Sequence, residues 1–106
     1  RPVLIPEPDA AAREADFAVL LPDGSLEPLY SAGAVLLCRR ERTLPRQGYA
    51  LFLLNGAPLL RRLYRRSGAS KLVAPNVDFK AIPVGDGDCL EYIGTITGQA
   101  KNCRWE

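Results

Sequence analysis

The chain has 106 residues, of which 47% are hydrophobic, so it can form one domain whose core needs no disulfide. No apolar run approaches the roughly 18 residues that cross a bilayer, and no basic segment followed by an apolar one opens the sequence, so we expect neither a membrane span nor a leader. We therefore expect a soluble, cytoplasmic domain. Because the sequence begins at Arg1 and contains no methionine, we expect it to be cut from a longer protein.

The net charge of +2 conceals an uneven distribution. Residues 29–71 carry nine basic groups and one acidic group, among them the pairs Arg61-Arg62 and Arg65-Arg66. A basic surface can bind nucleic acid or an acidic protein. Few aromatic residues are interleaved with these arginines, which argues against a surface for single-stranded nucleic acid. We therefore expect one arginine turned inward, the others solvated, and no direct contact of this domain with DNA.

Histidine is absent, and the three cysteines, Cys38, Cys89 and Cys103, have no C-x-x-C spacing. These facts exclude a structural zinc site and the Ser-His, Cys-His and HExxH catalytic groups. No G-x-G-x-x-G phosphate loop occurs either, so we expect neither a metal nor a cofactor. Reduced thiols are expected, with Cys38 and Cys89 buried as small hydrophobic residues.

Short apolar runs separated by turn residues predict strands along most of the chain. Residues 1–16 contain three closely spaced prolines, which disfavour a ladder-forming strand and predict an extended arm. Pro28 is expected to open one short helical turn, and residues 99–106 form a polar tail. The fold class is expected to be all-β with at most short helical turns. The predicted strands cover residues 17–21, 34–38, 49–54, 57–64, 71–74, 82–84 and 90–97.

The strongest local pattern is Asn55-Gly56 between two strand-like runs. Asn-Gly favours a two-residue hairpin loop because both central residues must take a positive φ. A loop at this position predicts that Ala50 lies opposite Arg61. The alternation of side chains along a strand then places Arg61 and Arg62 on opposite faces of the sheet.

The last predicted strand, residues 90–97, contains Thr95-Ile96-Thr97, a composition that suits a sheet edge. An unpaired edge can pair with a second chain. This strand and Trp105 in the tail are therefore candidates for a homodimer contact, and packing of Trp105 onto its own domain is the alternative.

Seven segments, taken in order, carry a resemblance to a known family: residues 17–20, 24–28, 31–36, 47–51, 60–63, 71–82 and 93–96. Residues 24–28, GSLEP, are similar to a G-(D/M)-S-M-x-P turn, and residues 60–63, LRRL, fall where the family writes V-K-R-L. Residues 71–82 resemble its L-x-P-x-N-x-x-(Y/F)-x-P-I segment, and residues 93–96 its I-x-G-x-V close. Together they resemble the C-terminal domain of LexA and of phage repressors, self-cleaving serine peptidases related to bacterial signal peptidases. The match covers residues 17–98 and implies twisted antiparallel sheets.

The resemblance implies a Ser-Lys dyad, in which a neutral lysine takes the proton of a serine that attacks a peptide bond of its own chain. Ser25 matches the nucleophile, and Arg61 occupies the lysine position. A buried lysine can lose its proton at neutral pH, whereas a guanidinium with a pKa above about 12 does not. We therefore do not expect Arg61 to act as a base, and we expect self-cleavage to be defective.

Other interpretations of Ser25 stay open. It can be a turn serine whose hydroxyl caps the following residues. It can also be a nucleophile with a substitute base, although a solvated carboxylate is a poor base for a hydroxyl. The remaining lysines are Lys71, Lys80 and Lys101, of which Lys71 or Lys80 could be the base if the fold carries it to Ser25. The candidate carboxylates are Asp16, Asp23 and Glu27.

These observations predict the regulatory and dimerisation domain of a LexA-like or phage-repressor-like transcriptional regulator, with a DNA-binding domain upstream of Arg1. The resemblance further implies a RecA-type inducer and a role in the SOS response. Two alternatives remain: an active serine peptidase with a nonstandard base, and a peptide-binding module that uses the old substrate cleft without cleavage.

Overall fold

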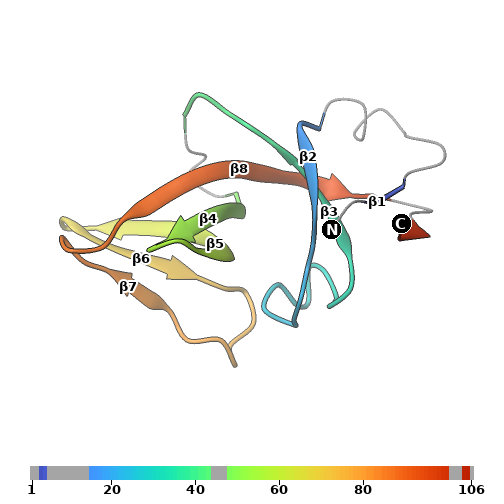
Figure 1. The fold of residues 1–106 in the computed structure, drawn as a ribbon. Coiled ribbons are helices and arrows are strands. Elements are labelled where there is room, and N and C mark those ends of the chain that lie inside the picture. The colour runs from blue at the N-terminus through green and yellow to red at the C-terminus, as the bar shows by residue number, and fades with distance from the viewer. Residues whose placement is uncertain (1–2, 5–14, 44–47, 101–103, 106) are drawn as a thin grey trace.

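The structure is a computed structural model that describes residues 3–4, 15–43, 48–100 and 104–105. These ranges contain strands and turns and no helix, and therefore no helix that could cross a membrane. All strand pairs are antiparallel, which confirms the all-β fold class (Figure 1). The strands are β1 (Val3–Leu4), β2 (Phe17–Leu20), β3 (Val35–Arg39), β4 (Ala50–Leu54), β5 (Ala57–Arg66), β6 (Ala69–Val73), β7 (Ile82–Val84), β8 (Leu90–Gln99) and β9 (Arg104–Trp105).

Seven strands form one sheet in the order β2-β3-β8-β4-β5-β6-β7. The long strand β8, orange in Figure 1, lies in its interior between β3 and β4. Thr95 of β8 has Arg39 as its partner on one side and Ala50 on the other. The prediction of an edge strand at residues 90–97 is therefore wrong, because a β-branched composition indicates a strand without specifying its neighbours.

The β4–β5 hairpin has the predicted register, with Ala50 opposite Arg61. Asn55 and Gly56 form its loop with φ values of 53° and 86°. Both values lie in the left-handed region, which asparagine and glycine tolerate better than other residues. This short loop fixes which residues of β5 face which side of the sheet, and so it fixes the orientation of Arg61.

Three hydrophobic clusters form the core of the described residues. The first packs beneath the turn that follows β2, the second fills the space enclosed by β4 to β8, and the third lies against β3. Alternate residues of β3 belong to different clusters, so this strand is covered on both faces. The buried members are Leu21, Leu26, Ala34, Leu36 and Leu60 in the first, Ala50, Phe52, Leu63 and Leu72 in the second, and Val35, Leu37 and Ala100 in the third.

Strand β1 differs from the arm predicted for residues 1–16. Val3–Leu4 pairs with Arg104–Trp105, so the first and last strands form a small second sheet. A proline lacks its own backbone N–H, but Val3 and Leu4 keep theirs and can enter a ladder. The backbone of Trp105 therefore pairs with its own chain.

The two described cysteines have different environments, and only one was predicted correctly. Cys38 is fully buried on β3, and Cys89 is exposed immediately before β8. Burial raises the pKa of the Cys38 thiol to about 11. At Cys89 the backbone, and not the side chain, bonds to the rest of the protein, because Cys89 N–H donates to Asn55 Oδ1 at 2.8 Å.

Candidate functional site

The turn that follows β2 presents Ser25. Pro22 ends the regular strand, and the backbone N–H of Ser25 donates to Asp23 Oδ1 at 3.0 Å. Glu27 N–H donates to the carbonyl of Gly24 at 3.1 Å, which tightens the turn. The predicted helical turn after Pro28 is replaced by hydrogen-bonded turns across residues 24–30. An aspartate that accepts from the residue two positions ahead is a common way of fixing such a turn.

Asn76 holds this turn from a distant part of the chain. Its Nδ2 donates to the carbonyl of Gly24 at 2.8 Å, across 52 residues of sequence. Its Oδ1 accepts from the backbone N–H of Asp78 at 2.9 Å, which fixes the amide orientation. Sequence reasoning gave Asn76 no role, and the only indication was its place in the family-like segment 71–82.

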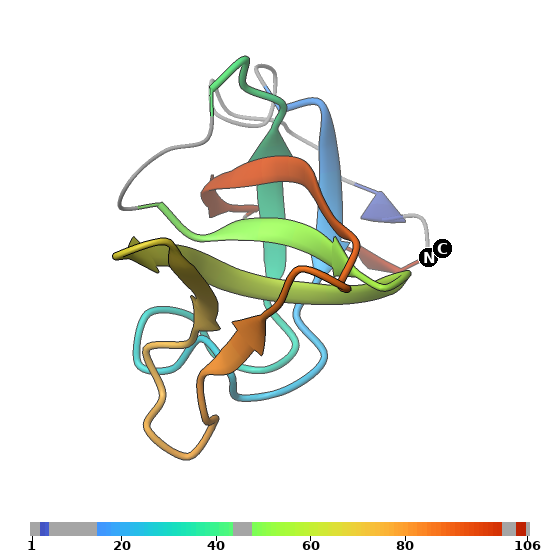
Figure 2. The same cartoon turned by 90° about the vertical axis from the view of Figure 1, so that its left-hand side faces the viewer.

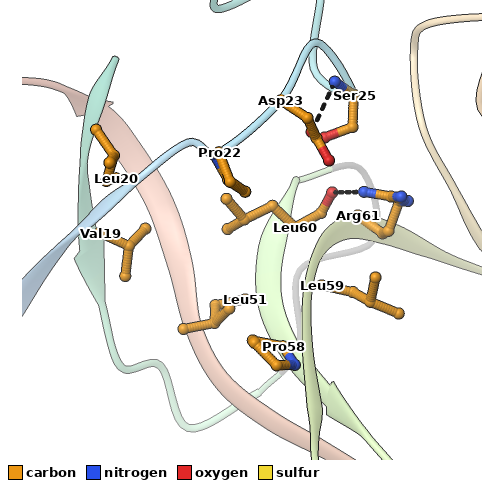
Figure 3. Close-up of a pocket in the computed structure, with 10 residues that line it drawn as sticks. All are labelled: Val19, Leu20, Pro22, Asp23, Ser25, Leu51, Pro58, Leu59, Leu60 and Arg61. Carbon is orange, nitrogen blue, oxygen red and sulfur yellow. Dashed lines mark hydrogen bonds between the residues drawn. The ribbon is translucent and has the colours of Figure 1, made fainter. Parts of the chain in front are cut away.

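Ser25 borders a hollow of about 190 Å³ between the β2 end of the sheet and the β4–β5 hairpin (Figure 3). The Ser25 residue is only 1% exposed. The apolar lining comes from β2, β4 and β5, and the polar lining comes from the turn and from Arg61. The lining residues are Val19, Leu20, Pro22, Asp23, Ser25, Leu51, Pro58, Leu59, Leu60 and Arg61.

Arg61 contributes the buried cation of this hollow. It is 6% exposed, and Figure 3 shows its guanidinium below the turn that carries Asp23 and Ser25. Arg61 Nη1 donates to the carbonyl of Leu60 at 2.9 Å, and Cζ lies 5.5 Å from the centre of the Phe79 ring. Arg61 Nε is buried and has no hydrogen-bond partner among the described residues. The structure thus brings together the two residues that the sequence singled out.

The sequence matches the family model described as Peptidase S24-like over residues 3–97. The chain belongs to the peptidase S24-like family. This finding confirms the resemblance to the LexA and phage-repressor C-terminal domains. A search of curated proteins finds no match.

Two charges of the S24-like site influence each other. The pKa of Asp23 lies below its ordinary 3.8, and the largest cause is its hydrogen bond with the Ser25 side chain. The hydrogen bond from the Ser25 backbone N–H and the positive charge of Arg61 lower the pKa further, while partial burial opposes the shift. Burial lowers the pKa of Arg61 from its ordinary value, and the charge of Asp23 acts in the opposite direction. The hydrogen bonds and the nearby cation keep the Asp23 carboxylate ionised next to Ser25.

The described lysines lie outside the hollow of this S24-like domain. Lys71 is exposed on β6, and its ammonium lies 5.2 Å from the centre of the Tyr64 ring. Lys80 is exposed in the segment before β7. Neither lines the hollow, so neither is a substitute base in this structure. Lys101 lies outside the described residues.

The other candidate carboxylates have separate roles. Asp16 Oδ2 accepts from the backbone N–H of Arg40 at 2.7 Å and does not line the hollow. Glu27 is exposed within the turn itself. Among the residues that the structure describes, no group of three histidine, cysteine, aspartate or glutamate side chains could hold a metal ion.

Proposed function

We propose that this S24-like domain is the regulatory and dimerisation domain of a LexA-like transcriptional regulator whose self-cleavage is defective. The observation that carries the proposal is the burial of Arg61 at the hollow that Ser25 borders. Even complete burial shifts a side-chain pKa by no more than about 3–5 units. A guanidinium that starts above 12 therefore stays protonated at pH 7, and the charge of Asp23 favours the protonated form further.

Asp23 does not supply the missing base. Its pKa is lowered from 3.8, chiefly by the Ser25 side chain. A carboxylate that is so weakly basic removes a proton from a hydroxyl poorly, because general-base catalysis works best when the pKa of the base is near the working pH. The Ser25 side chain instead helps to hold the Asp23 carboxylate in its ionised, weakly basic form. The site thus keeps the serine turn next to an ionised carboxylate.

The second part of the proposal is dimerisation. The edge strand that supports it is β2, and not the strand at residues 90–97 that the sequence suggested. The terminal strands of the large sheet are β2 and β7. Strand β7 contains Pro83, and proline on an edge strand hinders further pairing. Strand β2 contains no proline, and its Leu20 is 42% exposed. A two-fold pairing along β2 would set the spacing of two attached DNA-binding domains, as an operator with two half-sites requires.

Restoring the lysine tests the loss of cleavage. The full-length protein, its Arg61→Lys variant and the Arg61→Lys/Ser25→Ala double variant are incubated at alkaline pH, and fragments are measured by mass spectrometry. We expect fragments from Arg61→Lys alone. Ser25-dependent fragments from the unmodified protein would refute the loss of activity, and an intact Arg61→Lys variant would show that the arginine is not the lesion.

Sedimentation tests the dimer. At tens of micromolar we expect a dimer, weakened by Leu20→Lys, because a charge on an edge strand opposes pairing. Leu29→Lys is the matched control, since Leu29 is 54% exposed but lies in a turn. A monomeric unmodified chain, or equal effects of the two variants, would contradict the role of β2.

A second candidate function is peptide binding without cleavage. The exposed large hydrophobic residues of the described chain are Leu20, which lines the hollow, Leu29 in the turn that follows Ser25, and Val77, which is 93% exposed and follows Asn76. Exposed apolar side chains beside a largely apolar hollow are typical of a binding site. Calorimetric titration with an alanine- and valine-rich peptide checks it: binding that Val77→Glu abolishes supports this function, and absence of heat at millimolar peptide dismisses it.

A further inference from the structure

The end of the β5–β6 hairpin gathers four cationic side chains. Arg62, Arg65 and Arg66 lie on β5 and Lys71 on β6, and we call them the hairpin patch. The hairpin turn, yellow at the left of Figure 1, projects from one end of the molecule. Of these four, Arg65, Arg66 and Lys71 are exposed, and Arg62 is half-buried.

Strand register brings part of the patch together around one aromatic ring. Tyr64 on β5 is directly opposite Lys71 on β6, and Arg62 and Arg66 lie on the same face as Tyr64 because each is two positions away. The Lys71 ammonium is 5.2 Å and Arg62 Cζ 5.9 Å from the centre of the Tyr64 ring. Beside this group lies a shallow hollow of about 410 Å³, lined in part by Tyr64, Arg66, Lys71 and Pro83. The ring therefore orders two cations next to a space that a ligand can enter.

Within the described residues, Arg62 and Lys71 have the Tyr64 ring as their partner, and no carboxylate neutralises the four cations. The acidic turn at residues 85–88 follows β7, whose Val84 pairs with Ser70 of the hairpin, but the Asp88 carboxylate is bound by other groups. Its Oδ1 accepts from Asn55 Nδ2 at 3.0 Å and its Oδ2 from Gly85 N–H at 2.8 Å. Asn55 lies in the β4–β5 loop, at the other end of β5 from the β5–β6 turn (Figure 2). Like charges held this close repel one another, and a polyanion relieves the repulsion. The patch thus has the charge of a polyanion-binding surface.

The turn is shaped for close approach by a phosphate. Ser67 and Gly68 occupy it with φ values of 52° and 79°, and Ala69 and Ser70 follow. Together with Arg65 and Arg66, these small residues line a second hollow of about 400 Å³. Their size leaves the backbone and the serine hydroxyl groups open to a ligand beside the two arginines. Phosphate oxygens are commonly bound by arginine, lysine, serine and backbone N–H groups together.

We propose that the hairpin patch binds the phosphate backbone of double-stranded DNA without reading its bases. An acidic protein partner is less well matched, because protein interfaces rely on a few apolar or aromatic anchors buried at their centre. The aromatic ring of the patch already carries two cations. The sequence predicted solvated arginines with no direct DNA contact, because a separate domain was expected to read DNA, whereas the fold places four cations on one hairpin. The inference goes beyond the proposed function and does not depend on Ser25, Arg61 or dimerisation.

Fluorescence anisotropy of a labelled DNA duplex of arbitrary sequence, titrated with the 106-residue chain at several salt concentrations, tests the proposal. Each phosphate contact contributes about −0.9 to the slope of log K against log salt. We expect Arg66→Ala and Lys71→Ala each to reduce the magnitude of the slope by about one and to weaken binding equally for unrelated duplexes. Lys80→Ala, which removes an exposed charge outside the patch, is the matched control and should leave the slope unchanged.

Three outcomes would overturn the proposal. The first is no binding by the unmodified chain at low salt. The second is an equal loss in the Lys80→Ala control, which would assign binding to net charge. The third is a hairpin-dependent complex with polyglutamate in the absence of DNA binding, which would assign the patch to an acidic protein. Thermal unfolding of each variant verifies that the exposed substitutions leave the fold intact.

Discussion

Gly94 of β8, in the interior of the large sheet, lies beneath the ring of Phe17, which comes from the edge strand β2 two strands away. A Cβ built on Gly94 would stand 2.7 Å from Phe17 Cζ and 2.8 Å from Cε1, well inside van der Waals contact. The carbonyl of Arg39 lies 3.5 Å away on the other side. A methyl group at position 94 must therefore displace the ring, which also carries the Arg40 guanidinium at 5.4 Å from its centre.

The magnitude follows from these contacts. Forcing an extra carbon into a packed site typically destabilises a protein by about 1–3 kcal/mol. Loss of the exposed contact between Arg40 and Phe17 adds about 0.5 kcal/mol. We expect Gly94→Ala to lower the free energy of unfolding by about 2 kcal/mol, which lowers Tm by roughly 8–16 °C for a domain of this size.

Thermal and urea unfolding monitored by circular dichroism measures this change. Gly98→Ala is the matched control, because Gly98 is on the same strand and a Cβ there meets no atom within 4 Å. That variant should be neutral or more stable by up to about 1 kcal/mol. In a Phe17→Ala background, Gly94→Ala should lose most of its effect. Equal Tm values for the two glycine variants, or an undiminished effect without Phe17, would refute the packing argument.

Three further predictions concern the site and the thiols. Asn76→Asp should lower the free energy of unfolding by about 1–3 kcal/mol at neutral pH, measured by urea unfolding, because a carboxylate cannot donate to the Gly24 carbonyl. An unchanged urea midpoint would contradict the role of Asn76 in holding the turn. The pKa of Asp23 in the folded chain is lowered from 3.8, so the ionised carboxylate stabilises the fold fully above pH 3.8, and this stabilisation is lost as the pH falls through the folded pKa. Asp23→Asn should therefore flatten the decrease of Tm between about pH 5 and pH 2. An identical decrease in the variant would contradict this role of Asp23. Alkylation of the native chain at pH 8 should modify exposed Cys89 and spare Cys38, whose pKa is raised to about 11, as peptide mapping shows; early labelling of Cys38 would disprove its burial.

Local geometry made part of the fold predictable from the sequence. The Asn55-Gly56 loop permits few backbone conformations, so these two residues were enough to predict the pairing of Ala50 with Arg61. That register, with the alternation of side chains, explains why Arg61 reaches the hollow. The family-like order of motifs placed Ser25 and Arg61 together, and the structure brings both to one hollow.

Interactions between distant segments were not predictable in this way. The interior position of β8 depends on which strands compete for pairing, and its threonine-rich sequence carries no information on that competition. The hydrogen bond from Asn76 to the Gly24 carbonyl joins two turns that no periodicity connects. Cys89 is exposed because of the conformation of its turn, although free cysteine is usually buried.

The interior position of β8 has a consequence for how the chain folds. Leu36 of β3 pairs with Gln99, so the large sheet closes only through contacts between residues far apart in sequence. Contacts of this kind slow folding, because the loop entropy is lost before the pairing stabilises the chain. During synthesis, β3 and β4 emerge from the ribosome before their shared partner and expose open edges that can aggregate. A chain that ends before residue 90 would keep the Ser25 turn and the β5–β6 hairpin but would lack the strand that joins the two halves of the sheet.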